Sequence, residues 1–395
     1  MGERGFLRLA RSGRGLLFPL AILAALLTGA SSALLGTCGP FTDVAADAFC
    51  PFVLEIFYSG ITTGTSPTTY DPASNVSRLQ MAAFLSRTVD RTLLRGSSRA
   101  SLGQFFTPQN GFALGVTTLS SPQMVETDGA DLWVTNSNDT SVSRVRGGDG
   151  KVVETWTGAS IPFAVAVALG KVFVTGYTAP GRLHRIDPTQ PAGAVTTVAS
   201  NLGDHPQGIA FDGTFLWTAN SNGTVSRVTP GAVVPWTVVT TPGFGSVLGI
   251  LYDGTNIWVT DSVAGTLLKL DGTGSVLQTV TVGGSPAYPV FDGTNIWVPN
   301  QLPYSVSVVR ASSGAVLATL TGNGLNKPTQ AAFDGQRVLV TNYTGGTVSL
   351  WKAADRTEIG FFGTGTVGFA LPFGACSDGA SFWVANFNEH TLARF

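Results

Sequence analysis

Short apolar stretches recur along the C-terminal three quarters of the chain, and each is interrupted by a polar turn. The unit is an apolar run, then Asp-Gly, then a Leu-Trp-Val-like stretch that ends in Asn or Asp. Five copies contain the Trp: Asp128–Asn136, Asp212–Asn220, Asp253–Asp261, Asp292–Asn300 and Asp378–Asn386. Two more copies, Leu169–Gly176 and Asp334–Asn342, have Phe173 and Leu339 in its place. Successive copies are 39 to 44 residues apart, a spacing typical of a repeat architecture.

Each repeat predicts four antiparallel strands. Asp-Gly supplies the positive φ that a tight hairpin needs, between the apolar run and the Trp-containing strand. A third alternating strand follows, such as Thr224–Val228, and then a fourth, such as Val276–Val280. Four strands in about 40 residues form one blade of a propeller. The sequence therefore predicts an all-β fold, a seven-bladed β-propeller over residues 107–395.

The last repeat ends at its third strand, Thr391–Phe395. The stretch Gly111–Leu119 resembles a fourth strand that has no blade of its own. We expect it to pair with the C-terminal strand and close the ring.

The repeat resembles the YVTN/NHL group of bacterial propellers, in its order of Pro, apolar run, Asp-Gly, Trp-Val-Thr-Asn and Thr-Val-Ser-x-Val. That resemblance covers residues 107–395 and implies the fold. The group includes ligand-binding proteins, lactonases and lyases of the virginiamycin B lyase type. The resemblance therefore implies either a binding protein or, as the alternative, a lyase or lactonase that uses a divalent metal with histidine and acidic residues.

Residues 38–95 do not follow the repeat and predict a small α-helical module. Pro51–Tyr58 has helical spacing of apolar residues, and Ser77 followed by Gln80 fits the start of a second helix. The module resembles a single S-layer homology domain, with Val76–Gln80 matching that family's conserved motif. The resemblance implies that Arg78 contacts anionic cell-wall polysaccharide. Gln80 replaces the family's glutamate, and one copy stands where the family usually has three, so a vestigial or dimer-forming module is the alternative.

The first 33 residues predict a signal peptide, because four arginines precede an apolar stretch and a small-residue end. An uncleaved anchor or a lipoprotein acylated at Cys38 is the alternative, and only then would the protein contact a membrane.

In an oxidising compartment Cys38 and Cys50 could form a disulfide, and Cys376 falls at a buried apolar position. Residues 96–106 are rich in Gly, Ser and Arg and predict a linker. The expected location is extracellular or in the bacterial cell envelope.

Charge excludes one class of partner. Charged residues make up 12% of the 395-residue chain and the net charge is −1, so nothing indicates nucleic-acid binding.

Candidate chemistry is confined to the loops at one end of the blades. The loops that carry Pro and those that carry the last residue of the Trp strand should form one rim, a candidate site for an unknown ligand: Asn136, Asn220, Asp261, Asn300, Asn342 and Asn386. Capping of its own turn by each Asn is the alternative.

Among three histidines, His205 falls on this rim and is the one weak catalytic candidate. The sequence predicts no cofactor and no metal site, apart from the divalent metal that the lyase alternative requires. We expect a binding or scaffold protein whose partners are cell-wall polysaccharide or an envelope protein.

Overall fold

The computed structural model describes two compact units of the chain, which divide between Arg95 and Gly96. The described residues are 38, 41–44, 50–58, 61–66, 68–94, 119–148, 150–363, 369–379 and 381–394. The predicted signal peptide, the predicted linker and the predicted closing strand before Leu119 lie outside them. No helix in the described ranges is long and apolar enough to cross a membrane.

In its described residues the N-terminal unit contains two helices, α2 (Cys50–Tyr58) and α3 (Arg78–Leu94). Cys38 and Cys50 form a disulfide, which joins the start of α2 to the segment before it. A small apolar core forms around this bond: Cys38, Phe41, Val44, Cys50, Val53 and Leu54, with Phe57 and Tyr70 packed against it.

A reciprocal pair of hydrogen bonds begins α3. The backbone N–H of Ser77 donates to Oε1 of Gln80 at 2.8 Å, and the N–H of Gln80 donates to Oγ of Ser77 at 3.2 Å. These bonds form a capping box, which satisfies donors that the first turn of a helix leaves free. The predicted helix start at Ser77 is confirmed. Arg78 follows it directly and is exposed.

Asp43 connects two loops of the same unit. Its carboxylate accepts the backbone N–H of Tyr70 at 2.9 Å and of Asp71 at 2.6 Å. These hydrogen bonds stabilise the ionised form and hold the pKa of Asp43 below its usual value.

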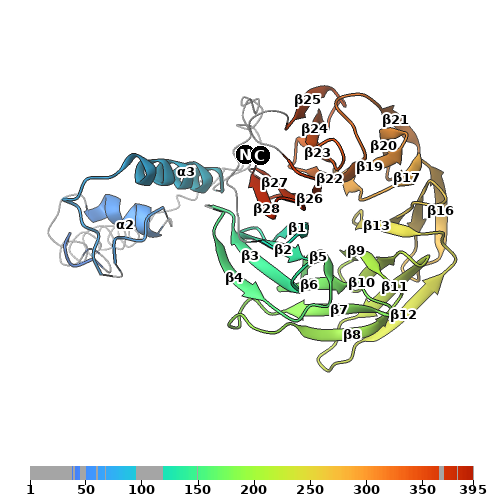
Figure 1. Ribbon diagram of the computed structural model, residues 1–395, viewed down its shortest axis with the longest axis horizontal. Coiled ribbons are helices and arrows are strands. Elements are labelled where there is room, and N and C mark those ends of the chain that lie inside the picture. Colours follow the sequence, from blue (N-terminus) through green and yellow to red (C-terminus); the bar gives the residue numbers. More distant parts are fainter. Residues whose placement is uncertain are drawn as a thin grey trace, which may run out of the picture. The chain divides into compact units, whose positions relative to one another are not determined.

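The C-terminal unit is a seven-bladed β-propeller, which confirms the predicted fold. Seven antiparallel sheets surround a central channel (Figure 1). In each blade the first strand lines the channel and the later strands lie progressively further out.

The first four blades have four strands each. Blade 1 is β1 (Pro122–Thr127), β2 (Asp131–Asn136), β3 (Ser141–Arg146) and β4 (Val152–Trp156). Blade 2 is β5 (Pro162–Ala168), β6 (Lys171–Gly176), β7 (Gly181–Ile186) and β8 (Thr196–Leu202). Blade 3 is β9 (Pro206–Phe211), β10 (Leu216–Asn220), β11 (Thr224–Thr229) and β12 (Thr237–Pro242). Blade 4 is β13 (Val247–Tyr252), β14 (Ile257–Asp261), β15 (Thr266–Leu270) and β16 (Val276–Thr281).

The inner strand of blade 5 is split in two. This blade is β17 (Gly284–Pro286), β18 (Val290–Phe291), β19 (Asn295–Leu302), β20 (Tyr304–Arg310) and β21 (Val316–Leu320). Blade 6 is β22 (Pro328–Phe333), β23 (Arg337–Asn342), β24 (Thr347–Lys352) and β25 (Glu358–Phe362). Blade 7 has three strands in the described residues, β26 (Pro372–Ser377), β27 (Phe382–Asn386) and β28 (Thr391–Arg394).

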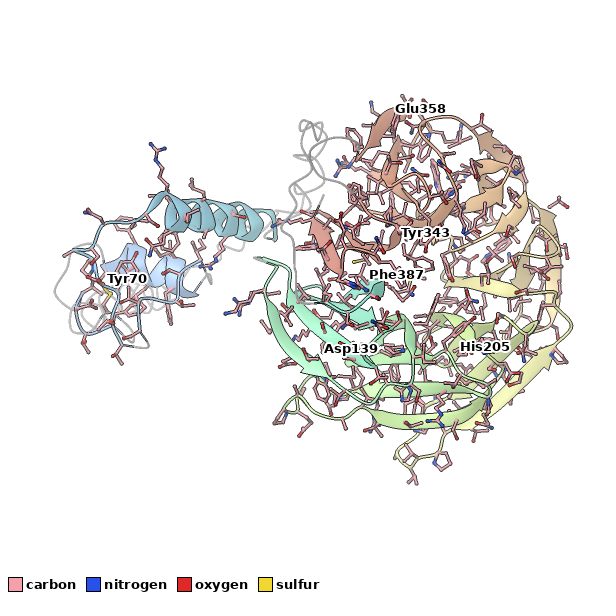
Figure 2. The ribbon with its side chains drawn as sticks, viewed as in Figure 1. Tyr70, Asp139, His205, Tyr343, Glu358 and Phe387 are labelled. Carbon is pink, nitrogen blue, oxygen red and sulfur yellow. A yellow bond between two sulfur atoms is a disulfide. The ribbon has the colours of Figure 1, made fainter. Side chains whose placement is uncertain are left out.

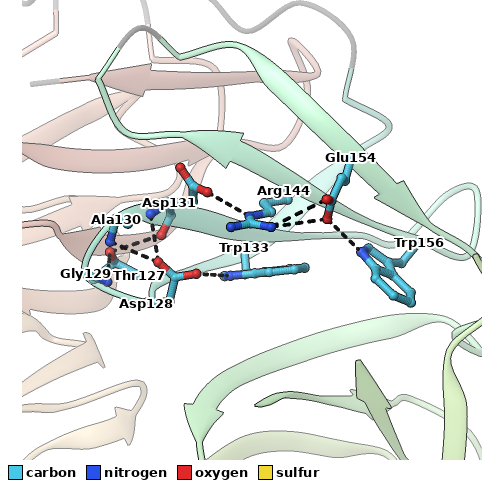
Figure 3. A network of polar contacts seen from close by, with 9 residues as sticks. All are labelled: Thr127, Asp128, Gly129, Ala130, Asp131, Trp133, Arg144, Glu154 and Trp156. Carbon is cyan, nitrogen blue, oxygen red and sulfur yellow. Dashed lines mark hydrogen bonds and ion pairs between the residues drawn. The ribbon is translucent and has the colours of Figure 1, made fainter. Parts of the chain in front are cut away.

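In the five repeats that contain the Trp, the Asp of the Asp-Gly turn accepts a hydrogen bond from that Trp on the following strand. In blade 1, Oδ1 of Asp128 accepts the backbone N–H of Asp131 at 2.8 Å, and Oδ2 accepts the indole N–H of Trp133 at 2.9 Å (Figure 3). The same indole bond, at 2.7 to 2.9 Å, recurs in four other blades: Asp212–Trp217, Asp253–Trp258, Asp292–Trp297 and Asp378–Trp383. Because an indole N–H needs a partner when the ring is buried, Asp and Trp occur together in the repeat.

Neighbouring blades are joined close to the channel. Oγ1 of Thr135 in blade 1 donates to the carbonyl of Phe163 in blade 2 at 2.6 Å. Thr260 and Thr341 make the equivalent bonds from blade 4 to blade 5 and from blade 6 to blade 7. These bonds fix the inner strands against one another, so the channel lining is held by the repeat itself.

Blades 7 and 1 close the ring. A Cβ on Gly374 would lie 2.4 Å from the carbonyl oxygen of Gln123, so only glycine permits this approach of the two inner strands. The backbone N–H of Ser121 donates to Nδ1 of His390 at 2.9 Å across the same junction. Leu119 packs with buried side chains of both blades, including Trp383.

Candidate binding site at the channel mouth

The Asn residues predicted to line a ligand rim are buried within their own blades. Nδ2 of Asn136 donates to Oγ of Ser141 at 3.0 Å and of Ser143 at 2.9 Å, and the residue is 1% exposed. The other amides bond hydroxyl groups of their third strands in the same way: Asn220, Asn300, Asn342 and Asn386. The geometry therefore favours the turn-capping interpretation over direct ligand contact for these side chains.

Asp261 takes the same position in blade 4. Its carboxylate accepts four backbone N–H groups, from Gly245 and Ser246 before β13 and from Val263 and Ala264 in its own turn. Asp261 is 3% exposed and therefore also holds loops together.

His205 lies on the loop before β9, at the predicted rim (Figure 2). Its backbone has a left-handed φ of 54°. The N–H of His205 donates to the carbonyl of Thr178 at 2.9 Å, and its imidazole packs on Tyr177 with ring centroids 4.6 Å apart. His205 is therefore one member of an aromatic group.

Aromatic rings gather at the end of the channel that carries the Pro-containing loops. Phe163, Tyr288 and Phe373 come from blades 2, 5 and 7, and their ring centroids are 5.7 to 6.3 Å apart. Tyr177 stacks on Phe163 at 5.5 Å, and Tyr343 meets Phe373 at 5.9 Å. The rings form a continuous chain from His205 to Tyr343, both labelled in Figure 2. We call this group the aromatic rim: Phe163, Tyr177, His205, Tyr288, Tyr343 and Phe373.

Tyr288 reaches across the channel from blade 5. Its ring contacts Phe163 and Phe373, and its hydroxyl donates to Oε1 of Gln207 in blade 3 at 2.7 Å. Burial, together with the neighbouring Tyr177, raises the pKa of Tyr288, so the phenol keeps its proton and remains a donor. Tyr288 belongs both to the aromatic rim and to the wall of the cavity behind it.

Amide side chains border these rings. Nε2 of Gln123 donates to Oγ of Ser137 at 3.3 Å, whereas Oε1 of Gln123 is buried and has no hydrogen-bond partner among the described residues. Oε1 of Gln330 accepts the N–H of Ala375 at 3.2 Å. Rings beside amides offer an apolar surface with hydrogen-bonding groups at its edge. Such a surface suits a neutral ligand that has apolar faces as well as hydroxyl groups.

A cavity of about 420 Å³ continues along the channel and is lined by the inner strands of all seven blades. Small and apolar residues make up much of its wall, among them Ala164, Gly208, Gly249 and Ala331. Glu126 is the single charged residue among the described residues that line it. Burial raises the pKa of Glu126 to about 7, against the smaller opposing effect of a hydrogen bond from the N–H of Thr127.

The histidines are distributed over separate parts of the propeller. His184 is buried in blade 2, His390 lies at the junction of blades 7 and 1, and His205 lies on the rim. Within the described ranges no three His, Cys, Asp or Glu side chains are grouped so that they could hold one metal ion. The divalent metal of the lyase alternative therefore finds no fitting set of ligands in this part of the chain.

Comparison with known families identifies the N-terminal unit. Residues 40–82 match the S-layer homology domain. This part of the unit is an S-layer homology domain. Such a domain implies association with the cell surface or envelope. No curated protein sequence matches the chain.

Solved structures resemble the propeller. Hydrazine synthase from Kuenenia stuttgartiensis is 18% identical with a TM-score of 0.59, over 71% of this chain and 96% of that chain. A catalytically inactive virginiamycin B lyase from Staphylococcus aureus, solved with quinupristin, is 16% identical with a TM-score of 0.58, over 72% of this chain and 98% of that chain. The structural neighbours thus include propellers of the virginiamycin B lyase type, and at these identities the likeness concerns the fold alone.

Most members of the aromatic rim stand at two fixed positions of the repeat. Phe163 and Phe373 each follow the Pro that begins an inner strand, and Tyr177 and Tyr343 each follow the last residue of a second strand. Four of the six rim residues therefore stand at these two repeat positions. Tyr288 has no such signal, because the inner strand of blade 5 is interrupted there.

Proposed function

We propose that this protein is a non-catalytic binding protein of the bacterial cell envelope. Its S-layer homology domain binds cell-wall polysaccharide, and its propeller binds a neutral glycan at the aromatic rim. The predicted signal peptide would deliver it outside the cytoplasm, where the Cys38–Cys50 disulfide is stable.

The continuous chain of rings from His205 to Tyr343 carries the proposal for the propeller. Aromatic faces stack on the C–H faces of sugar rings, and amides such as Gln123 bind hydroxyl groups. The aromatic members other than Tyr288 are partly exposed, so a ligand can reach them. Lys327, whose ammonium lies 4.9 Å from the centroid of Tyr343, adds a donor at the edge.

Arg78 supports the proposal for the S-layer homology domain. It is exposed at the first position of α3, directly after the capping box. A guanidinium here can form paired, charge-assisted hydrogen bonds to an anionic group of the wall polymer.

Co-sedimentation with purified bacterial cell walls tests the anchoring. The wild-type chain should pellet with walls and should stay in solution with walls stripped of their secondary polysaccharide. Arg78→Ala should weaken this retention roughly tenfold, the loss expected when a charge-assisted contact is removed. Arg310→Ala, on β20 of the propeller, is the matched control and should bind as the wild type does. Equal retention on intact and stripped walls would contradict wall-polymer binding.

A further inference from the structure

The channel cavity has a chemistry that the aromatic rim lacks. Its wall is formed by inner strands, where glycine and alanine bring backbones close together and apolar side chains fill the remainder. A volume of about 420 Å³ is within the range of small-molecule sites.

Glu126 introduces one uncompensated charge into this wall. Its Oε1 accepts the N–H of Thr127 at 3.0 Å, a contact with its own chain neighbour. No Lys, Arg or His is among the described residues that line the cavity. A carboxylate in a low-dielectric wall without a cation is unfavourable, so the site favours either a proton or a positively charged ligand.

The groups around Glu126 do not neutralise it. Cys376 on β26 lies in the same lining, and burial followed by the charges of Glu126 and Asp378 raises the pKa of its thiol, which therefore stays neutral. Tyr252 and Tyr288 supply the phenol groups of the lining, and burial raises the pKa of Tyr288, which therefore keeps its proton. On β2 the residue paired with Glu126 is Trp133, and β5 contributes the uncharged Ala164 and Val165 to the lining.

Aromatic rings lie at the same end of the cavity as Glu126. In three blades the residue directly before the Asp of the turn is aromatic: Tyr252, Phe291 and Phe333. Glu126 lies near the same end of its inner strand, two residues before the Asp of its turn. Aromatic faces attract cations when water is excluded. Ser377, at the corresponding position of blade 7, adds a hydroxyl that can accept a hydrogen bond.

We propose that the channel cavity binds a small organic cation, a protonated primary amine on an apolar body, with Glu126 as its counter-ion. This site lies behind Tyr288, and its occupation does not depend on the glycan proposed for the rim. A metal ion is not the expected ligand, since one carboxylate without further charged donors does not make a metal site.

Calorimetric titration of the full chain at pH 7 tests this proposal, with cyclohexylammonium and its neutral analogue cyclohexanol as probes. The ammonium should bind at least tenfold more tightly than the alcohol. Because the pKa of Glu126 is about 7, binding should release about half a proton per ligand, measured in two buffers of different ionisation enthalpy.

Glu126→Gln keeps the shape of the side chain and removes its charge. The variant should lose both the tenfold preference and the proton release, and its thermal melt will show that it is folded. Glu358→Gln, an exposed carboxylate on β25, is the matched control and should keep both. Equal affinity for the two probes, binding of neither, or a preference that persists in Glu126→Gln would overturn the proposal.

Discussion

His184 occupies the space that Gly176 leaves empty in blade 2. A Cβ on Gly176 would lie 2.9 Å from Nε2 of His184. That nitrogen accepts the backbone N–H of Ser160 at 3.2 Å, just as Oδ1 of Asn136 accepts the N–H of Ser120 at 3.4 Å in blade 1. One blade thus replaces the Asn and Ser of the repeat with Gly and His and keeps the same backbone group satisfied.

Restoring only half of the usual pair should destabilise blade 2. Gly176→Asn forces a side chain against His184 and the carbonyl of Ser160, and overpacking of this kind costs roughly 1–3 kcal/mol. The double variant Gly176→Asn with His184→Ser recreates the pair found in blade 1 and should recover most of that loss. Urea unfolding of the two variants and of His184→Ser alone gives the coupling energy between positions 176 and 184. If the two substitutions change the free energy of unfolding additively, the Gly and His do not replace the Asn and Ser as a pair.

His184 should make stability depend on pH in the acidic range. Burial, and then the charge of Arg182, lowers the pKa of His184 from 6.5 to about 4. Between these values the unfolded chain binds the proton more readily, so the contribution is complete above pH 6.5 and is lost as the pH falls towards 4. The expected loss is about 3 kcal/mol. Between pH 7 and pH 4 the unfolding free energy of the wild type should therefore fall by about this amount more than that of the double variant.

Glu126 should make stability depend on pH in the opposite direction. Its pKa is raised from 4.5 to about 7, so the folded chain holds the proton more readily and stability falls as the pH rises from 4.5 through 7. Glu126→Gln removes this penalty and should be more stable than the wild type at pH 8, by up to about 3 kcal/mol. Thermal unfolding at pH 5 and pH 8 checks this prediction, since a gain of equal size at both values would point to a cause other than ionisation.

The turn aspartates should contribute more to the stability of the propeller than exposed aspartates do. Asp253 accepts the indole N–H of Trp258 and two backbone N–H groups, all within 2.8 Å. Asp253→Ala leaves a buried indole donor unsatisfied and should cost roughly 2–3 kcal/mol. Asp355→Ala, in an exposed turn of blade 6, should cost less than about 1 kcal/mol. Denaturant midpoints of the two variants make the comparison, and similar losses would contradict a special role for the Asp–Trp bond.

The repeat predicts the propeller well because each blade carries its own turn and its own buried strand. One departure from the motif also follows a local rule: with Leu339 in place of Trp, Asp334 accepts a bond from Nε of Arg337 at 2.7 Å instead. The aromatic rim is harder to predict from the sequence, because it depends on rings from different blades that meet across the channel. The predicted rim asparagines were conspicuous because they repeat, and they repeat because every blade needs its turn capped.

The central claim, that the propeller binds a glycan at the aromatic rim, is tested most directly at Phe373, whose ring contacts Phe163, Tyr288 and Tyr343. The measurement is a calorimetric titration of the full chain with neutral oligosaccharides, a series of cello-, chito- and xylo-oligosaccharides. At least one should bind the wild type and the control Phe361→Ala, an exposed ring on β25, with equal affinity. Phe373→Ala should bind it roughly tenfold or more weakly. An oligosaccharide that binds the Phe373→Ala variant as tightly as the wild type, or no binding by any of the series, would contradict the claim.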